Sequence, residues 1–307
     1  MGDNSFIMDL ILTIFIEMKY KFSHDVKLTK RQVQKILFAL KMELINEIGD
    51  ELPFYWYNHG PFSELVAGDL DGLVGKFLST EPKNGYNLYV MKSELTNTLV
   101  DDYIVDSIVN IVKKANPFNF NPFISYIYNE FAPFDFMPNF KIEFLNAFTE
   151  YNKHISNGQT LLDVYLENPV TSKDLLEICY DCEAKLPFDP LFKDFNESFS
   201  RFLSVFETIY ENEPDNEVLF FKTYELADEI IWNTFSGGVR ILQEGHDDYY
   251  EDKLDNWKYD FQNSLSNMKI KIKDFSYNDF KFTSDDNYEL SETSRKLLNA
   301  TIGSYIK

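Results

Sequence analysis

The stretch that decides the fold, residues 29–49, reads TKRQVQKILFALKMELINEIG. Thr29 and Gln32 have the spacing of a capping box, which predicts that a helix begins here. The apolar residues that follow recur every three or four positions, as one buried helix face requires: they are Val33, Ile36, Leu37, Leu40, Leu44 and Ile48. This pattern stops at Gly49, so the sequence predicts one helix that ends there.

Two further helices are expected on either side of this one. Before it, an apolar face behind Ser5, a suitable N-cap, predicts a first helix; its members are Ile7, Leu10, Ile11, Ile14, Phe15 and Met18. After it, Gly60-Pro61 is expected to open a third helix over residues 61–73, because proline is preorganised for a first helical turn.

A β-hairpin is expected next. Residues 77–80 and 86–90 are short aromatic and β-branched runs, and they are joined through Asn84-Gly85, the strongest local hairpin signal. Three helices followed by a hairpin is the order of a winged helix. The sequence therefore predicts a winged-helix-like domain over residues 1–95.

A larger, acidic helical domain is expected over residues 96–307. Its aromatic and proline-rich segment, residues 117–148, predicts short helices joined by turns. Asp189-Pro190 is expected to begin a helix with a phenylalanine-rich face, and another helix is expected to end at Gly237-Gly238.

Apolar residues in the C-terminal part of the sequence follow first a helical spacing and then a strand-like alternation. A helix face is predicted for Tyr250, Leu254, Trp257, Phe261 and Leu265. Met268, Ile270 and Ile272 then alternate with lysines, as in a half-buried strand, and residues 280–283 and 287–290 flank an Asp-Asp turn. The expected fold class is therefore mainly α, with a small β-hairpin near the C-terminus as an option.

Charge and cysteine content limit the partners and the compartment. The 307 residues include 29 basic and 50 acidic ones, and the net charge of −21 repels phosphate backbones and anionic membrane surfaces. The two cysteines exclude a disulfide framework and suit a reducing compartment. With no signal-peptide or membrane-spanning pattern, a cytoplasmic protein without a membrane or general nucleic-acid partner is expected.

The most distinctive stretch, residues 52–63, reads LPFYWYNHGPFS. Together with Gln34-Lys35-Ile36-Leu37-Phe38 on the preceding helix, it resembles the Panacea domain of SocA-like proteins, in which a KLLY helix precedes a W-x-x-G-P turn. The resemblance covers residues 28–75. Phe38 stands where the family has tyrosine, and Trp56 lies four residues before Gly60.

The resemblance implies an antitoxin or a protease adaptor, which binds a toxin-like protein or a substrate for delivery. A homodimer is compatible with this role. The residues expected to line or support the contact are Tyr55, Trp56, Tyr57, His59, Pro61 and Phe62. The aromatics are equally explained if they only pack the third helix onto the second. His59 fits a hydrogen-bonded turn residue better than a ligand or a base.

A DNA-binding regulator is the alternative, because a winged helix can place its third helix in the major groove. Residues 63–72 contain three acidic residues and no Lys or Arg, which opposes this role. One basic strip on the second helix could contact phosphate or an acidic protein surface, or could be a solvated face; it comprises Lys27, Lys30, Arg31, Lys35 and Lys41.

Other reactive groups have simpler explanations. Cys179 and Cys182 could be half a zinc site or a redox pair, but they share one helical face with Leu175 and fit buried positions.

A metal-dependent hydrolase is a third hypothesis, although carboxylates in a first helical turn are also explained by the helix dipole. The residues of this candidate site are Glu244, His246, Asp247, Asp248, Glu251 and Asp252. No phosphate loop or nucleophile elbow is present. The sequence therefore predicts a binding protein with no catalytic residues, cofactor or metal.

Overall fold

The fold is mainly helical, with a small antiparallel sheet near the N-terminus, and this confirms the predicted class. The computed structural model describes residues 5–22, 26–83, 85–92, 100–156, 170–212, 216–242 and 247–284. The chain divides into a first unit, residues 1–132 and 239–257, and a second unit, residues 133–238 and 258–307. Within the described residues, every helix is too short or too polar to cross a membrane.

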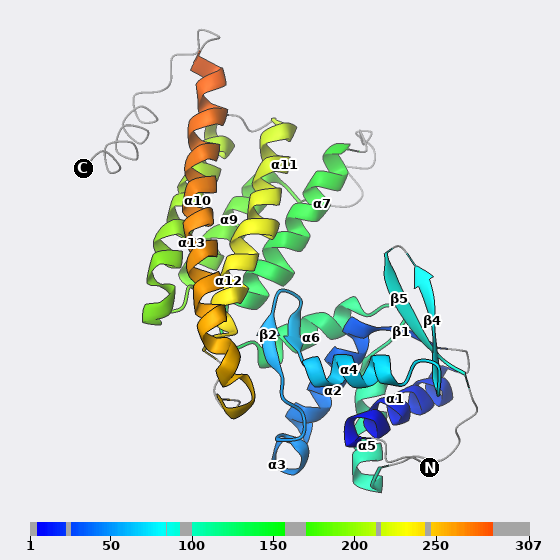
Figure 1. Ribbon diagram of the computed structural model, residues 1–307. Helices are drawn as coiled ribbons and strands as arrows, with labels where there is room; N and C mark the ends of the chain where they lie inside the picture. The colour runs from blue at the N-terminus through cyan, green and yellow to red at the C-terminus, as the bar shows by residue number, and fades with distance from the viewer. Residues whose placement is uncertain are drawn as a thin grey trace. The chain divides into compact units, whose positions relative to one another are not determined.

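Helix α2 (Lys30–Glu43) is the centre of the first unit. It contacts α1 (Phe6–Phe22), α4 (Glu64–Gly72), α5 (Asp102–Lys114) and α6 (Asn121–Phe131) (Figure 1). The predicted capping box is confirmed, and α2 is followed, after a non-helical Leu44, by the short α3 (Ile45–Ile48). Since α5 and α6 pack on α1 and α2, the first unit does not end at residue 95 but includes residues up to 132.

The predicted wing is present and is part of a larger sheet. Strand β4 (Leu78–Lys83) pairs antiparallel with β5 (Tyr86–Met91). Gly85, in the turn between them, has a φ of 84°, which glycine adopts without strain. Strand β1 (Lys27–Thr29), which the sequence analysis did not predict, pairs with the other edge of β5, so that the order is β1-β5-β4.

The third helix begins later than predicted. Gly60-Pro61 does not open it; these residues lie in strand β3 (Gly60–Phe62), which pairs with β2 (Tyr55–Tyr57). The helix begins at Glu64 instead, because the Ser63 hydroxyl accepts a hydrogen bond from the Val66 N–H, as an N-cap does.

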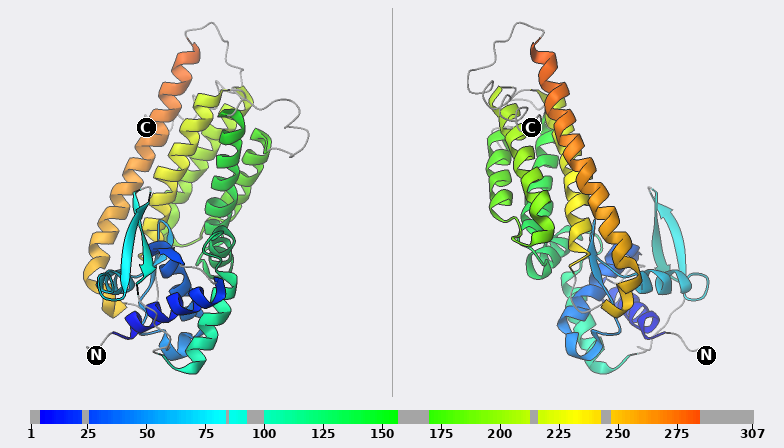
Figure 2. Two further views of the ribbon diagram at one scale, coloured as in Figure 1. Left: turned by 90° about the vertical axis from the view of Figure 1, so that its right-hand side faces the viewer. Right: turned by 60° about the vertical axis from the view of Figure 1, so that its left-hand side comes forward.

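The second unit is a bundle of helices that lie side by side (Figures 1 and 2). In chain order its helical segments are η1 (Pro138–Phe144), α7 (Leu145–Ser156), α9 (Ser172–Ala184), η2 (Pro190–Phe192), α10 (Lys193–Asn212), α11 (Glu217–Glu225), η3 (Leu226–Ile231) and α12 (Trp232–Val239). Helix α13 (Asp247–Ser284) begins in the first unit and ends in the second. The predicted start of a helix at Asp189-Pro190 is confirmed, since the Asp189 carboxylate caps η2 and α10 follows it directly.

Two segments of the second unit, η1 and η3, are π-helices, and the spacing of the buried residues accounts for both. Four residues of an α-helix overshoot a full turn by about 40°. Residues spaced four apart would therefore move gradually around an α-helix. A π-helical turn contains about one more residue, so it returns them to the same face. Two such fully or almost fully buried rows occur: Phe136, Phe140, Phe144 and Phe148 across η1, and Leu219, Thr223, Ala227, Ile231 and Phe235 across η3. The aromatic segment at residues 117–148 thus contributes largely to the core.

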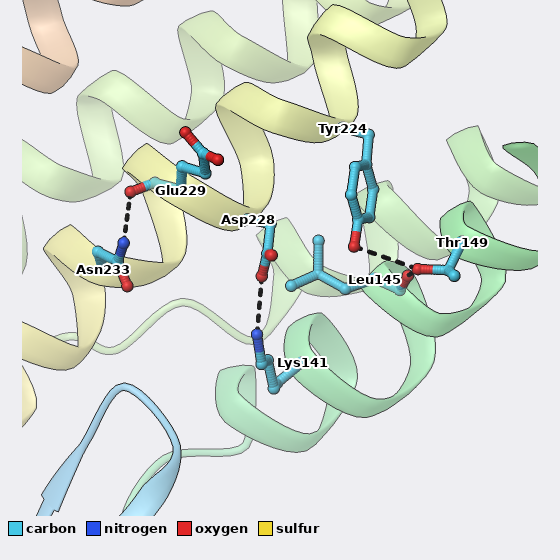
Figure 3. A network of polar contacts seen from close by, with 7 residues as sticks. All are labelled: Lys141, Leu145, Thr149, Tyr224, Asp228, Glu229 and Asn233. Atoms are coloured by element: carbon cyan, nitrogen blue, oxygen red, sulfur yellow. Dashed lines mark hydrogen bonds and ion pairs between the residues drawn. The ribbon is translucent and has the colours of Figure 1, made fainter. Parts of the chain in front are cut away.

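An ion pair joins the two π-helical segments (Figure 3). Lys141 Nζ on η1 lies 2.8 Å from Asp228 Oδ1 on η3, and it also lies 5.3 Å from the ring centroid of Trp232. Nearby, Thr149 Oγ1 and the Tyr224 hydroxyl are 3.2 Å apart. Because each group has a partner, this network is explained by the packing of the helices and does not require a ligand.

The predicted C-terminal strand is wrong. Residues 268–272 and 280–283 continue α13, and residues 287–290 lie outside the described part of the chain. Met268 and Ile272 are buried, but Ile270 between them is 56% exposed. The helical face that includes Phe261 and Leu265 therefore continues through Met268 and Ile272, and the alternation with lysines is incidental.

Gly237-Gly238 was expected to end a helix, but both residues lie inside α12, which ends at Val239. A Cβ atom at position 238 would lie 2.7 Å from Phe192 Cε1 and 2.9 Å from Phe261 Cε2. At position 237 the nearest contact of a Cβ atom would be an ordinary 3.9 Å. Gly238 therefore permits two phenylalanine rings to approach the helix backbone.

These two glycines form a matched pair of test sites. Gly237→Ala should raise the free energy of unfolding by about 0.5–1 kcal/mol, because alanine loses less backbone entropy in a helix. Gly238→Ala should lower it by about 1–3 kcal/mol, because the added methyl group overpacks the core. Urea denaturation of both variants measures the difference, and equal effects would contradict this packing.

Candidate functional site

Residues 55–62 form a β-hairpin against α2, which we call the aromatic hairpin. Tyr55 lies opposite Phe62, Tyr57 lies opposite Gly60, and Asn58 and His59 form the turn. Gly60 has a φ of 85°, which disfavours any other residue. The fold of this stretch therefore follows from one glycine and from the pairing of the aromatic run 55–57 with residues 60–62.

A buried glutamine of α2 fixes the end of the aromatic hairpin. Gln34 Nε2 donates to the Ser63 carbonyl oxygen at 2.8 Å, and the Ser63 N–H donates to Gln34 Oε1 at 2.9 Å. Both residues are almost completely buried. Each of these hydrogen bonds satisfies a backbone group that would otherwise cost about 1–3 kcal/mol.

Two buried lysines of α2 hold the same segment. Lys35 Nζ donates to the Pro61 carbonyl oxygen at 3.0 Å, and Lys41 Nζ donates to the Leu52 carbonyl oxygen at 2.8 Å. Lys35 is 1% exposed and Lys41 is 6% exposed. Together with Gln34 they form a set of side chains that we call the α2 clamp.

Burial changes the ionisation of both lysines. It lowers the pKa of Lys35 well below its usual value, and the charge of Arg31 adds to this effect. Burial also lowers the pKa of Lys41, to about 8, although the carboxylate of Asp50 opposes the change. The charged form of each lysine in the α2 clamp is therefore less favourable in the folded chain than in water.

The predicted basic strip does not form a continuous surface, because its two buried lysines belong to the α2 clamp. Of the remaining members, Lys27 pairs with Glu81 at 2.5 Å and Lys30 pairs with Asp71 at 2.7 Å. Arg31 is exposed. The positive charge available to an outside partner on this helix is thus much smaller than the sequence indicated.

One side of the aromatic hairpin is core. The Trp56 ring lies 5.7 Å from Phe38 and 5.3 Å from Tyr128, in both cases edge to face. Phe38 also packs against Phe54. Two positions that carry the family resemblance, Phe38 and Trp56, therefore contact each other in the interior.

The other side of the hairpin contacts residues 239–242 and 247–257, which belong to the same unit and which we call the strap. The Tyr55 ring lies 5.0 Å from Tyr250 and 4.9 Å from Trp257. The Arg240 guanidinium lies between two rings, 4.9 Å from the Tyr57 centroid and 5.0 Å from that of Trp257. These distances are those of aromatic and cation–π contacts.

Polar contacts also join the strap to the residues around the hairpin. The Tyr250 hydroxyl donates to the Pro53 carbonyl oxygen at 3.1 Å. Lys253 forms an ion pair with Glu64, the first residue of α4. Glu64 is one of three acidic residues that α4 carries without any Lys or Arg.

The residues expected at a partner contact have different environments. Tyr55, Trp56 and Pro61 are buried, Phe62 is half-buried, His59 is exposed in the turn, and Tyr57 is 36% exposed. The hairpin therefore offers an open edge at Tyr57 and His59, and its remaining aromatic residues support that edge or contact the strap. Both sequence interpretations of the aromatics, core and surface, describe part of the hairpin.

The other candidate groups are placed as follows. Cys179 and Cys182 are buried on α9, and burial raises the pKa of both thiols, which fits apolar positions. Glu244 and His246 lie outside the described residues, whereas Glu251 and Asp252 are exposed on α13. Within the described part of the chain, no group of three His, Cys, Asp or Glu residues could hold a metal ion.

Sequence reasoning missed the strap and the α2 clamp. The helix face that begins with Tyr250 and Trp257 was recognised, but its target is encoded almost 200 positions earlier, so no local pattern indicates it. Lys35 and Lys41 looked like surface residues because lysine is rarely buried. Their only signal is their position on or beside the apolar face of α2.

The α2 clamp predicts a pH dependence of stability. Lys41 has a folded pKa of about 8 against an ordinary value of 10.5, so this group holds more protons in the unfolded chain between these values, and its contribution to stability rises with pH. We expect this contribution to increase by about 1–2 kcal/mol between about pH 7.5 and 9.5, allowing for partial hydration of the amine, as the difference between the unchanged chain and Lys41→Met. Lys35 acts in the same direction.

Urea denaturation across this range measures the increase, and Lys41→Met should reduce it while Lys76→Met, on the surface, should not. Burial also raises the pKa of the Cys179 and Cys182 thiols, which oppose the trend from about pH 8.5, and that of Tyr55, Tyr89 and Tyr128, which oppose it only above about pH 10. Because these groups are the same in both chains, an equal pH dependence of the unchanged chain and of Lys41→Met would contradict the burial of Lys41.

Comparisons with known proteins identify no relative. No protein-family model, no curated protein and no solved structure matches this chain. The resemblance to SocA-like proteins therefore remains a prediction from the motif residues, and the function has to be argued from the site itself.

Proposed function

We propose that the first unit is a protein-binding module whose contact surface is centred on Tyr57 and His59 at the open edge of the aromatic hairpin. The observation that supports this most is that the α2 clamp hydrogen-bonds to the end of a short hairpin whose Tyr57 remains 36% exposed. Tyrosine and arginine are enriched in binding hot spots, and a preorganised contact loses little entropy when it binds.

The partner in this proposal is a protein with a basic surface. The net charge of −21 attracts cationic proteins and increases their rate of association. The resemblance to SocA-like proteins points to a toxin-like partner or to a substrate that is delivered to a protease, within the cytoplasm. Neutralising or delivering that partner is the activity that we propose.

DNA binding is the weaker alternative. In the winged-helix mode the third helix approaches phosphates, but α4 carries acidic residues and no cation. Lys30, a basic residue beside it, is already paired with Asp71 of that helix. A protein partner requires no such cations and is therefore favoured.

The test compares three tagged forms of the full chain, purified from the cells in which the protein occurs. A Tyr57→Ala, His59→Ala variant should lose a co-purifying protein by about tenfold or more, as expected for a hot spot. Tyr86→Ala, which removes a 46% exposed tyrosine of the wing, is the matched control and should retain it. Equal retention by all three forms, or salt-sensitive recovery of nucleic acid in place of protein, would refute the proposal.

A further inference from the structure

The strap covers a part of the aromatic hairpin that would otherwise be an apolar surface beside Tyr57. Tyr55, Tyr250 and Trp257 form an apolar cluster of their own, and Phe62, Ile241 and Leu254 pack against it. Tyr55 is only 6% exposed because of these contacts. The exposed edge and the covered surface are therefore continuous on one hairpin.

The covering residues have the pattern of a helical peptide ligand. Tyr250, Leu254 and Trp257 are spaced i, i+4 and i+7 on the first turns of α13, so that they share one face. Lys253, on the same turns, reaches Glu64. Recognition of an amphipathic helix by an apolar surface uses this spacing of anchors.

We propose that the strap is a ligand in cis, and that it occupies a docking surface for an amphipathic helix from the protein partner. The partner helix would carry two aromatic residues seven positions apart and a basic residue between them, in the places of Tyr250, Trp257 and Lys253. This inference rests on the proposed function and deepens it, because it names the chemistry of the partner and the step that admits it.

Charge complementarity supports this choice of partner. Glu64 lies at the N-terminus of α4 and contacts Lys253 although both side chains keep contact with solvent, 43% and 38% exposed respectively. In such an exposed ion pair, a lysine of the partner helix can replace Lys253 with little change in free energy. The cation–π contact of Arg240 with Tyr57 extends the same preference for positive charge to the open edge.

The strap limits how readily the partner helix binds. A segment attached to the same chain acts at a high effective concentration, so an outside helix must compete with it. Its apparent affinity is reduced by the fraction of molecules in which the surface is covered. Weakening the strap without altering the hairpin should therefore increase the affinity for an outside helix.

The experiment uses a fluorescent peptide of residues 247–260 as the outside helix and the full chain as the receptor. Lys253→Glu in the chain places two carboxylates together and weakens the strap, while the peptide lysine can still pair with Glu64. Anisotropy titration should give a dissociation constant about tenfold lower for this variant than for the unchanged chain. A peptide with Tyr250→Ala and Trp257→Ala is the control and should not bind either form.

The charge-reversed pair supplies a second control. Lys253→Glu combined with Glu64→Lys restores the attraction that holds the strap, so a peptide that also carries Lys253→Glu, and can still pair with position 64, should again bind weakly. Equal binding to the unchanged chain and to Lys253→Glu, or no binding to either, would overturn the inference. It would also be overturned if Lys253→Glu removed the hydrogen-exchange protection of α2, because the strap would then be part of the core.

This assay contains no outside protein, so its result is independent of the capture experiment with Tyr57 and His59. Loss of capture by the Tyr57→Ala, His59→Ala variant together with failure of the peptide assay would retain the binding module and reject the strap as its ligand. Success of the peptide assay without a captured protein would retain the covered surface as a helix-binding surface and reject the contact proposed at Tyr57 and His59.

Discussion

The first unit depends on the hydrogen bonds that the α2 clamp makes with the backbone of residues 52–63. Half of this segment lies outside strands β2 and β3, and its buried carbonyl and N–H groups need partners. Gln34, Lys35 and Lys41 supply them from a single helix. Since an unpaired buried group costs more than a formed hydrogen bond gains, the clamp determines the position of the hairpin more than it adds net stability.

Once the hairpin is held in this way, the alternation of a β-strand assigns the aromatic residues. Successive side chains point to opposite faces, so Trp56 enters the core while Tyr55 and Tyr57 face the strap. A dense aromatic run can therefore serve packing and recognition together. Two acidic groups of α4, Glu64 and Asp71, likewise form ion pairs with lysines of the fold.

The parts of the fold that sequence predicted are those in which local chemistry is sufficient. Thr29 with Gln32 marked the start of α2, and Asn84-Gly85 marked the wing. Prediction failed where a distant residue decides the outcome. Pro61 is in a strand because residues 55–57 pair with the strand that contains it. A glycine stands at position 238 inside α12 because Phe192 and Phe261 need room there, and Lys35 can be buried because the Pro61 carbonyl oxygen accepts its hydrogen bond.

The candidate site was predicted in composition but not in arrangement. Tyr57 and His59 are where a contact edge would need them, whereas Arg240 and the strap come from a segment whose role no motif indicates. The π-helical segments show a different limit. Their four-residue spacing is visible in the sequence, yet it fits neither the α-helical nor the strand period, so a search for those two periods passes over it.

Hydrogen exchange of a Gln34→Leu variant tests the central claim most directly. Leucine keeps much of the apolar volume and removes both partners of Ser63, so the account predicts that amides in residues 55–63 lose protection while those of α10, in the second unit, do not change. Unchanged protection of residues 55–63 would contradict the claim that the α2 clamp holds the aromatic hairpin in place.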